Sequence, residues 1–193
     1  SNASPVALVR ILMQVTDPII DRVEKRLVHG DLQCGNVHVF EMDPTDPDKN
    51  RVKVGNFAAT RWKNSSIVDE QRTPVPVRYC APEILRSAGQ SNYNEWSDIY
   101  AFGVLVWQAC SYGKVPYESS LTSGEVRQRK LNGEKLPDPL GCEAGICRIM
   151  EYCWFDEPQI RAQFKVIKQH LTHLERTYVF KHLIDLLCRE TNA

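Results

Sequence analysis

An aspartate and an asparagine five residues apart form the pattern in this chain that most directly suggests chemistry. They lie in the segment His29-Gly30-Asp31-Leu32-Gln33-Cys34-Gly35-Asn36, between a helical pattern and a β-branched run. The Asp31 carboxylate can accept the proton of an attacking hydroxyl, and the Asn36 amide oxygen can hold a magnesium ion that bridges nucleotide phosphates. Because phosphoryl transfer requires this pair, we expect Asp31 to be a residual base position and Asn36 a residual metal-binding position.

This segment alone leaves three interpretations open. It resembles the catalytic loop of eukaryotic protein kinases. The glycine between the histidine and the aspartate also resembles the loop of small-molecule phosphotransferases of the aminoglycoside and choline kinase type. A third interpretation is structural, because turns rich in aspartate and asparagine often connect a helix to a strand. In that case Asp31 only organises its own loop.

Three later segments resemble protein kinases, and tyrosine kinases in particular. They are Pro-Val-Arg-Tyr-Cys-Ala-Pro-Glu-Ile-Leu at 76–85, Trp-Ser-Asp-Ile-Tyr-Ala-Phe-Gly-Val-Leu-Val-Trp at 96–107 with its continuation to 117, and Cys-Trp-Phe-Asp-Glu-Pro-Gln-Ile-Arg-Ala-Gln-Phe at 153–164. The first looks like the end of an activation segment. Small-molecule phosphotransferases lack all three, so the chain is similar to the large, C-terminal lobe of a tyrosine-kinase-like domain, over about residues 8–174.

The resemblance also implies structural roles for four charged or polar residues. Glu83 should pair with Arg161 across the base of the lobe. Asp98 should accept hydrogen bonds from the backbone of the catalytic loop, because one carboxylate can satisfy several amide donors. His29 should act as a structural residue of the same loop.

The chain departs from the family pattern at positions that matter for catalysis. Asn56-Phe57-Ala58 stands where the family has aspartate-phenylalanine-glycine. An asparagine oxygen can touch magnesium, but it neutralises no charge, so Asn36 and Asn56 are degenerate magnesium positions and we expect no tightly bound metal. Gln33 and Gly35 stand where serine/threonine kinases carry a lysine and tyrosine kinases an arginine.

The features of a small kinase lobe are missing from the sequence. An active kinase needs a glycine-rich strand, a lysine on the third strand and a glutamate on the next helix. The 28 residues before His29 have a helical pattern, and no two of the ten glycines are two positions apart. We therefore expect the large lobe alone, with no bound cofactor; ATP and magnesium would matter only if the parent protein is active.

The periodicity predicts a mostly α-helical fold with a small β-hairpin. A helix is expected over 5–25, where Pro18 kinks or divides it, and strands over 37–40 and 51–54. Residues 58–78 have neither period and are expected to form a long loop. Further helices are expected over 81–87, 96–112, 123–132, 143–154 and 161–188.

The predicted domain organisation has three parts. Residues 1–3 look like the remnant of a cleaved expression tag. Residues 4–175 form the kinase-like lobe, and residues 176–193 form a C-terminal helical extension. The apolar residues of this extension either complete the core or face a partner; the sequence leaves both open.

Composition narrows the partners and the compartment. The 24 lysines and arginines balance the 24 aspartates and glutamates, so no global charge favours nucleic acid or an anionic membrane. No apolar run approaches the roughly 18–20 residues of a membrane span. Seven cysteines without a framework spacing indicate reduced thiols and a cytoplasmic, intracellular protein.

These observations favour a catalytically impaired pseudokinase lobe that acts as a regulatory or protein-binding module. The alternative is a divergent ATP-dependent protein kinase that phosphorylates protein hydroxyls and whose small lobe lies outside this chain. Asp31 and Asn36 keep that alternative open. In either case we expect a protein partner, or self-association, at the surface that a small lobe normally covers.

Overall fold

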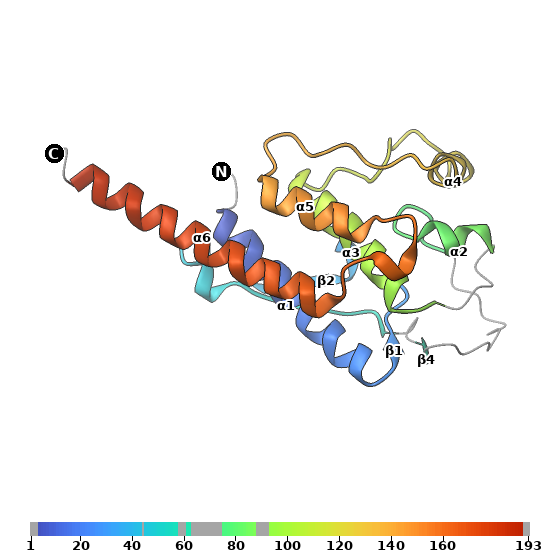
Figure 1. The fold of residues 1–193 in the computed structure, drawn as a ribbon, viewed down its shortest axis with the longest axis horizontal. Helices are drawn as coiled ribbons and strands as arrows, with labels where there is room; N and C mark the ends of the chain where they lie inside the picture. The colour runs from blue at the N-terminus through green and yellow to red at the C-terminus, as the bar shows by residue number, and fades with distance from the viewer. Residues whose placement is uncertain (1–3, 44, 58–60, 63–74, 88–92, 191–193) are drawn as a thin grey trace.

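The chain folds into a helical bundle with two small pairs of strands (Figure 1). The computed structural model describes residues 4–43, 45–57, 61–62, 75–87 and 93–190. Within these ranges, six α-helices account for most of the regular structure. The prediction of a mostly α-helical large lobe with a hairpin near its start is therefore confirmed.

Two long helices lie side by side along one flank of the molecule (Figure 1). Helix α1 spans Pro5–Glu24 and α6 spans Phe164–Glu190. Arg10 joins them through an ion pair with Glu175 at 2.6 Å. Pro18 lies inside α1 without dividing it. The buried apolar residues of α1 follow the helical period of the sequence: Ala7, Val9, Leu12, Val15 and Ile19.

The central helix is α3, Glu95–Cys110, and most of its residues are buried. A helix that is apolar on all sides needs packing partners on all sides. Asn94 caps its first turn by accepting two backbone hydrogen bonds. Helix α5, Ala144–Cys153, packs so closely that a Cβ atom at Gly103 would lie 2.6 Å from the Cys153 Cβ atom.

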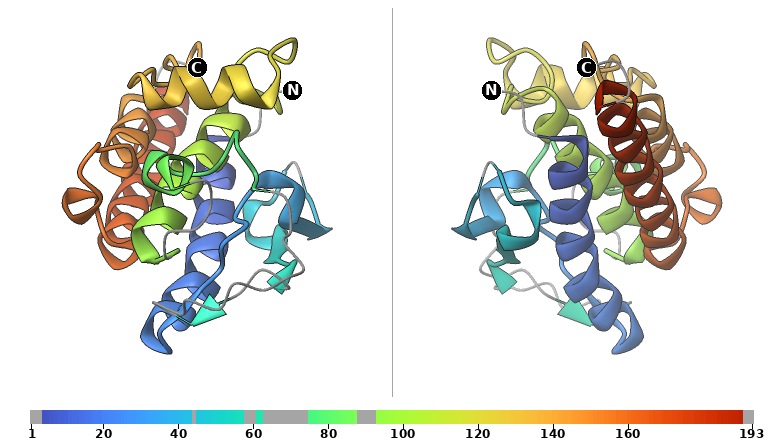
Figure 2. Two further views of the ribbon diagram at one scale, coloured as in Figure 1. Left: turned by 90° about the vertical axis from the view of Figure 1, so that its right-hand side faces the viewer. Right: turned by 90° about the vertical axis from the view of Figure 1, so that its left-hand side faces the viewer.

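The predicted hairpin is formed by β2, Val37–Glu41, and β3, Arg51–Val54, which pair antiparallel with one bulge. The 3-10 turn η2 at Pro47–Lys49 lies in the connection. The hairpin is fixed to α1, because the Gln14 side-chain oxygen accepts a hydrogen bond from the Val52 N–H at 3.0 Å. Figure 2 shows α1 between this hairpin and α6.

A second strand pair falls partly in the segment predicted to be a loop. Strand β1, Leu27–Val28, pairs antiparallel with β4, Arg61–Trp62. The prediction of a continuous loop over 58–78 is therefore wrong at β4. Two residues are too few to show an alternating pattern, and this strand exists only because a distant segment pairs with it. Residues 58–60 and 63–74, which include Ala58, lie outside the described residues.

Two shorter helices complete the lobe. Helix α2 spans Pro82–Arg86, and α4 spans Ser123–Leu131. A capping box at Thr122 and Glu125 begins α4. Figure 2 shows α4 and the β1–β4 pair at opposite ends of the molecule.

Two predicted helix starts, at residues 5 and 123, match the structure, and the other helix ends differ from the predicted ends by one to three residues. The largest difference is in the last helix, which was predicted from residue 161 and begins at Phe164. The 3-10 turn η4 at Pro158–Ile160 precedes it, because the proline and the following turn delay the α-helical bonding. Helix α6 then continues without a break through residues 175 and 176, and the division into lobe and extension stays a prediction. Residues 1–3 lie outside the described residues.

Candidate active site

One buried carboxylate anchors the 29–36 segment to the central helix. Asp98 of α3 accepts hydrogen bonds from the backbone N–H groups of His29, at 2.7 Å, and Gly30, at 2.9 Å. Burial raises the pKa of Asp98 to about 7, while the two N–H donors act in the opposite direction. The centre of the fold thus fixes the backbone immediately before Asp31.

The His29 imidazole connects this segment to the end of β3. Its Nε2 atom lies 3.0 Å from the Gly55 carbonyl oxygen, and its Nδ1 atom accepts the Asp31 N–H at 3.2 Å. These partners suit a neutral ring that donates through Nε2. Because the ring is fully buried, desolvation lowers the pKa of His29. A Cβ atom at Gly55 would lie 2.4 Å from the ring of the exposed His38, so a side chain there would require His38 to move.

The Asp31 carboxylate accepts hydrogen bonds from three side-chain amides. Gln33 Nε2 donates to Oδ1 at 2.7 Å. Asn36 Nδ2 and Asn56 Nδ2 donate to Oδ2 at 2.9 Å and 2.8 Å. Asn36 also donates to the Asp31 carbonyl oxygen at 2.6 Å. The fold therefore brings together all three predicted reaction-site residues. It adds Gln33, which the sequence marked only as a missing positive charge.

Asn56 is held in an unusual backbone conformation. Its φ angle is +57°, a left-handed value that asparagine tolerates better than most residues. The N–H of the preceding Gly55 donates to the Asn36 carbonyl oxygen at 2.8 Å. The following Phe57 ring meets His29 edge-to-face with ring centroids 5.3 Å apart, and Arg22 lies 3.6 Å over it. Contacts on both sides therefore direct the Asn56 amide towards Asp31.

These residues, as they lie, form a set of hydrogen bonds around the Asp31 carboxylate. The Nδ2 atoms of Asn36 and Asn56 donate to Asp31, and their Oδ1 atoms are oxygen ligands of a kind that magnesium takes, but they carry no formal charge. Only one carboxylate takes part where the family pattern has two. Across the described ranges, no group of three or more His, Cys, Asp or Glu side chains is placed to hold a metal ion.

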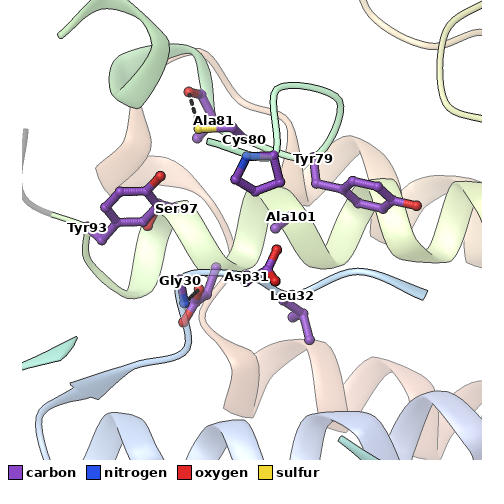
Figure 3. Close-up of a pocket in the computed structure, with 11 residues that line it drawn as sticks. Gly30, Asp31, Leu32, Tyr79, Cys80, Ala81, Tyr93, Ser97 and Ala101 are labelled. Atoms are coloured by element: carbon purple, nitrogen blue, oxygen red, sulfur yellow. Dashed lines mark hydrogen bonds between the residues drawn. The ribbon is translucent and has the colours of Figure 1, made fainter. Parts of the chain in front are cut away.

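A small pocket lies beside Asp31 (Figure 3). Gly30, Asp31 and Leu32 form one side of it. The other side comes from the segment before α2 and from α3 and its approach: Pro76, Tyr79, Cys80, Ala81, Tyr93, Ser97, Asp98 and Ala101. It has room for about one water molecule. Asp31 therefore borders the end of the activation-like segment, and the pocket that the described residues form there is smaller than a nucleotide.

Glu83 and Arg161 form a separate, structural ion pair. Arg161 Nη1 and Nη2 donate to the two Glu83 oxygens at 2.7 Å and 2.9 Å. The same guanidinium donates to the carbonyl oxygens of Phe155 and Trp96, both at 2.9 Å. The Arg161 side chain is fully buried. The pair joins α2 to the segment before α6, as the resemblance implied.

Sequence reasoning missed Lys130, which organises the approach to α2. Its ammonium donates to the carbonyl oxygens of Val77, Arg78 and Cys80, at 3.1 Å, 3.2 Å and 2.5 Å. Lys130 is 2% exposed, and burial lowers its pKa to about 7. No local pattern reveals this role, because a lysine on a polar helix is usually exposed. The role of Lys130 becomes visible only in the structure, where the carbonyl groups of residues 77–80 lie against α4.

The helical lobe, with a catalytic-type loop hydrogen-bonded to its central helix and the bidentate Glu83–Arg161 pair, defines a protein-kinase-like large lobe. Residues 1–171 match the model of the family described as "Protein tyrosine and serine/threonine kinase". The chain belongs to this family. Its relatives are tyrosine kinases, so it is a fragment of a tyrosine-kinase-like catalytic domain. This decides between the two resemblances of the catalytic loop in favour of protein kinases.

Three relatives illustrate the extent of the match. Human "Tyrosine-protein kinase Srms" is 31% identical over 86% of this chain and 32% of its own length. "Tyrosine-protein kinase transforming protein Fps" of avian sarcoma virus (strain PRCII) is 30% identical over 80% of this chain and 27% of its own length. Human "Tyrosine-protein kinase Fer" is 26% identical over 88% of this chain and 19% of its own length. The chain thus spans a third or less of these relatives. None of the helices described here is long and apolar enough to cross a membrane.

Proposed function

We propose that this chain is a catalytically impaired, tyrosine-kinase-like lobe that serves as a regulatory or protein-binding module. The observation that carries the proposal is the hydrogen bond from Asn56 Nδ2 to Asp31 Oδ2 at 2.8 Å. Two carboxylates at these positions would repel each other unless a cation lay between them. The amide of Asn56 instead donates a hydrogen bond to the Asp31 carboxylate. The site then holds one negative charge in place of two, and no cation is needed to offset a repulsion between carboxylates.

The other two amides support the same proposal. Gln33 and Asn36 occupy two further acceptor positions of the Asp31 carboxylate, so that three of its roughly four positions are filled. A base must be free to accept the proton of an incoming hydroxyl, and each amide donor competes with that hydroxyl. Gly35, at the arginine position of tyrosine kinases, contributes no side chain and has no atom within 4 Å of where its Cβ would be.

The test measures nucleotide binding by thermal shift. The chain, and a longer version of the protein that extends upstream, are heated with ATP alone and with added magnesium or manganese. A ligand that binds only the folded state raises the melting temperature. We expect no ATP-dependent shift in this chain and no metal-dependent phosphate transfer to protein by the longer version. Metal-dependent transfer that disappears in an Asp31→Asn variant would overturn the proposal.

A divergent active kinase remains the second candidate, because Asp31 and Asn36 are retained and Asp31 borders the pocket formed with Pro76 and Tyr79. In that case ATP and magnesium bind only when the upstream lobe is present, and Asn36 and Asn56 must turn their oxygens towards the metal. A metal-dependent shift confined to the longer version distinguishes this candidate from the first.

The binding part of the proposal rests on an exposed apolar surface. Val39, Phe40 and Met42 at the end of β2 are 57%, 65% and 52% exposed, and Phe57 beside the site is 38% exposed. Large apolar side chains that gather on a surface indicate a covering partner. We propose an intracellular protein partner or a second copy of the chain at this surface, which would correspond to the face that a small lobe covers.

Sedimentation velocity over a range of concentrations tests self-association at this surface. If copies associate through β2, Phe40→Ser should lower the sedimentation coefficient at high concentration. Leu140→Ser is the matched control, because Leu140 is also apolar, is 97% exposed and belongs to the segment between α4 and α5. If the chain is a monomer at every concentration, a second copy does not cover this surface. The proposed partner is then a different protein, and binding experiments with the longer version would identify it.

A further inference from the structure

Helix α6 extends beyond the helix that it packs against (Figure 1). Ion pairs join the two helices along their length: Arg10 with Glu175, Asp17 with Lys168, and Glu24 with Lys165. Because the residue numbers rise along α1 while they fall along α6, the helices are antiparallel. The first turn of α1, which begins at Pro5, therefore lies level with the residues just after Tyr178. From there α6 continues to Glu190 with no part of α1 beside it.

The side of α6 that faces the lobe changes from apolar to polar at Tyr178. Its buried or partly buried residues recur at steps of three and four: Phe164, Ile167, Leu171, Leu174 and Tyr178. The same steps lead next to Lys181 and His182, and both of these side chains are exposed. The apolar stripe that packs on the lobe thus ends at the level where α1 ends.

The opposite side of α6 changes in the reverse sense. Before Tyr178 its residues, again at steps of three and four, are polar: Lys165, Gln169, Thr172 and Arg176. After Tyr178 they are apolar. Val179, Phe180 and Ile184 are 36%, 64% and 43% exposed, and the sequence continues this side with leucine at positions 183 and 187. Residues 179–187, the distal segment of α6, therefore have an apolar face directed away from the lobe, and such a face needs a partner.

A basic and an acidic residue stand at the two ends of this apolar face. Arg176 precedes the distal segment and is exposed, and the sequence has Glu190 two heptads later. Positions two heptads apart return to the same side of a helix. If two copies of the segment ran antiparallel, Arg176 of each copy would lie beside Glu190 of the other. Parallel copies would bring like charges together, so the pattern is complementary to itself only in the antiparallel direction.

We infer that the distal segment of α6 pairs antiparallel with the same segment of a second copy of the chain, centred on position 183. The same surface serves on both copies, so the contact closes at a dimer. Because the segment is short, the contact should bury less than the about 1,200 Å² at which standard interfaces begin. The dimer is therefore expected to form reversibly and to depend on protein concentration. The distal segment shares no residue with the hairpin surface or with the Asp31 site.

Sedimentation velocity on the whole chain, over a wide range of concentrations, tests the pairing. We expect an equilibrium between monomer and dimer. Phe180→Ser should raise the dissociation constant of the dimer about tenfold or more, because it removes the largest exposed apolar side chain of the distal segment. Val166→Ser is the matched control and should leave the dimer unchanged, since Val166 is 38% exposed on the same helix but precedes the segment. Circular dichroism should show that both variants keep their helical content.

Charge reversal tests the direction of the pairing. Arg176→Glu and Glu190→Arg each bring like charges together at both ends of an antiparallel contact. Each should weaken the dimer severalfold at low salt, where screening is least. The double variant restores opposite charges at both ends and should recover the affinity of the unaltered chain. In a parallel dimer the unaltered chain already brings like charges together, so the single reversals should then weaken nothing.

Three results would overturn the inference. The first is a monomer at every concentration, which would leave a different protein as the partner of this face. The second is an equal effect of Phe180→Ser and Val166→Ser, or a dimer that is lost in Phe40→Ser and kept in Phe180→Ser, because the contact would then lie elsewhere. The third is a dimer that neither single charge reversal weakens. None of these results depends on whether the Asp31 site is active.

Discussion

Asn56 donates its side-chain amide to the Asp31 carboxylate at 2.8 Å, although 25 residues separate the two in sequence. The contact is made possible by the left-handed backbone of Asn56 and by the packing of Phe57 against His29. It replaces the pair of carboxylates that would surround a metal ion. The absence of that second charge is the physical basis of the impaired function proposed above.

Asn56→Asp should restore a response to divalent metal ions. Without metal, the new carboxylate repels Asp31 and the amide hydrogen bond is lost, so the variant should be less stable by about 1 kcal/mol. Added manganese or magnesium should then raise its melting temperature more than that of the unaltered chain, because two carboxylates attract the ion. Thermal unfolding with and without metal gives both values.

The control for this experiment is Asp31→Asn combined with Asn56→Asp, which keeps a single carboxylate in the site. This double variant should lose the metal response. An equal metal response in the unaltered chain and in Asn56→Asp would show that position 56 does not limit metal binding.

Removal of one partner of the Glu83–Arg161 pair should be strongly destabilising. Glu83→Ala leaves the fully buried Arg161 guanidinium without its carboxylate, and the loss of one partner of a buried pair typically costs about 3–5 kcal/mol. Urea unfolding measures this change. Replacing both residues with apolar ones, Glu83→Leu with Arg161→Met, should recover part of the loss. A cost below about 1 kcal/mol in the single variant would mean that water compensates the charge.

Gly30→Ala should strain the loop before Asp31. The φ angle of Gly30 is +79°, a value that disfavours side chains by about 1–2 kcal/mol. The variant should therefore lower the free energy of unfolding by about that amount. Gly35→Ala in the same segment is the matched control, because its backbone is not left-handed and a Cβ atom there would meet nothing within 4 Å. Equal effects of the two substitutions would argue against the strain.

The stability should depend on the protonation of His29. Its pKa is lowered by burial, so the unfolded chain binds a proton more readily than the folded one. The stability contributed by the neutral ring is therefore complete above the unfolded pKa of about 6.5 and is lost as the pH falls through the folded value. Asp98 has the opposite effect on stability. Burial raises its pKa to about 7, so its contribution to stability falls as the pH rises from the usual aspartate pKa to about 7.

The difference between the unaltered chain and His29→Asn isolates the histidine, because Asp98 is present in both. The stability advantage of the unaltered chain over the variant should shrink as the pH is lowered from about 7 to 5. Chemical unfolding at several pH values within this window measures it. An advantage that stays constant or grows towards low pH would contradict a neutral, buried His29.

The sequence by itself determined the family and the helical framework of this protein. Helical periodicity identified α1, and the segments at 76–85, 96–117 and 153–164 carried the resemblance to tyrosine kinases. These features are local, since a helix period or a short motif depends on neighbouring residues along the chain. The replacement of a carboxylate by Asn56 could be predicted for the same reason.

Only the tertiary structure decided how those residues act. The orientation of the Asn56 and Gln33 amides towards Asp31, the strand pair formed by Arg61–Trp62, and the carbonyl contacts of Lys130 all depend on segments far apart in sequence. Such contacts arise when helices and loops pack into one core, and no local pattern encodes which side chains then face each other.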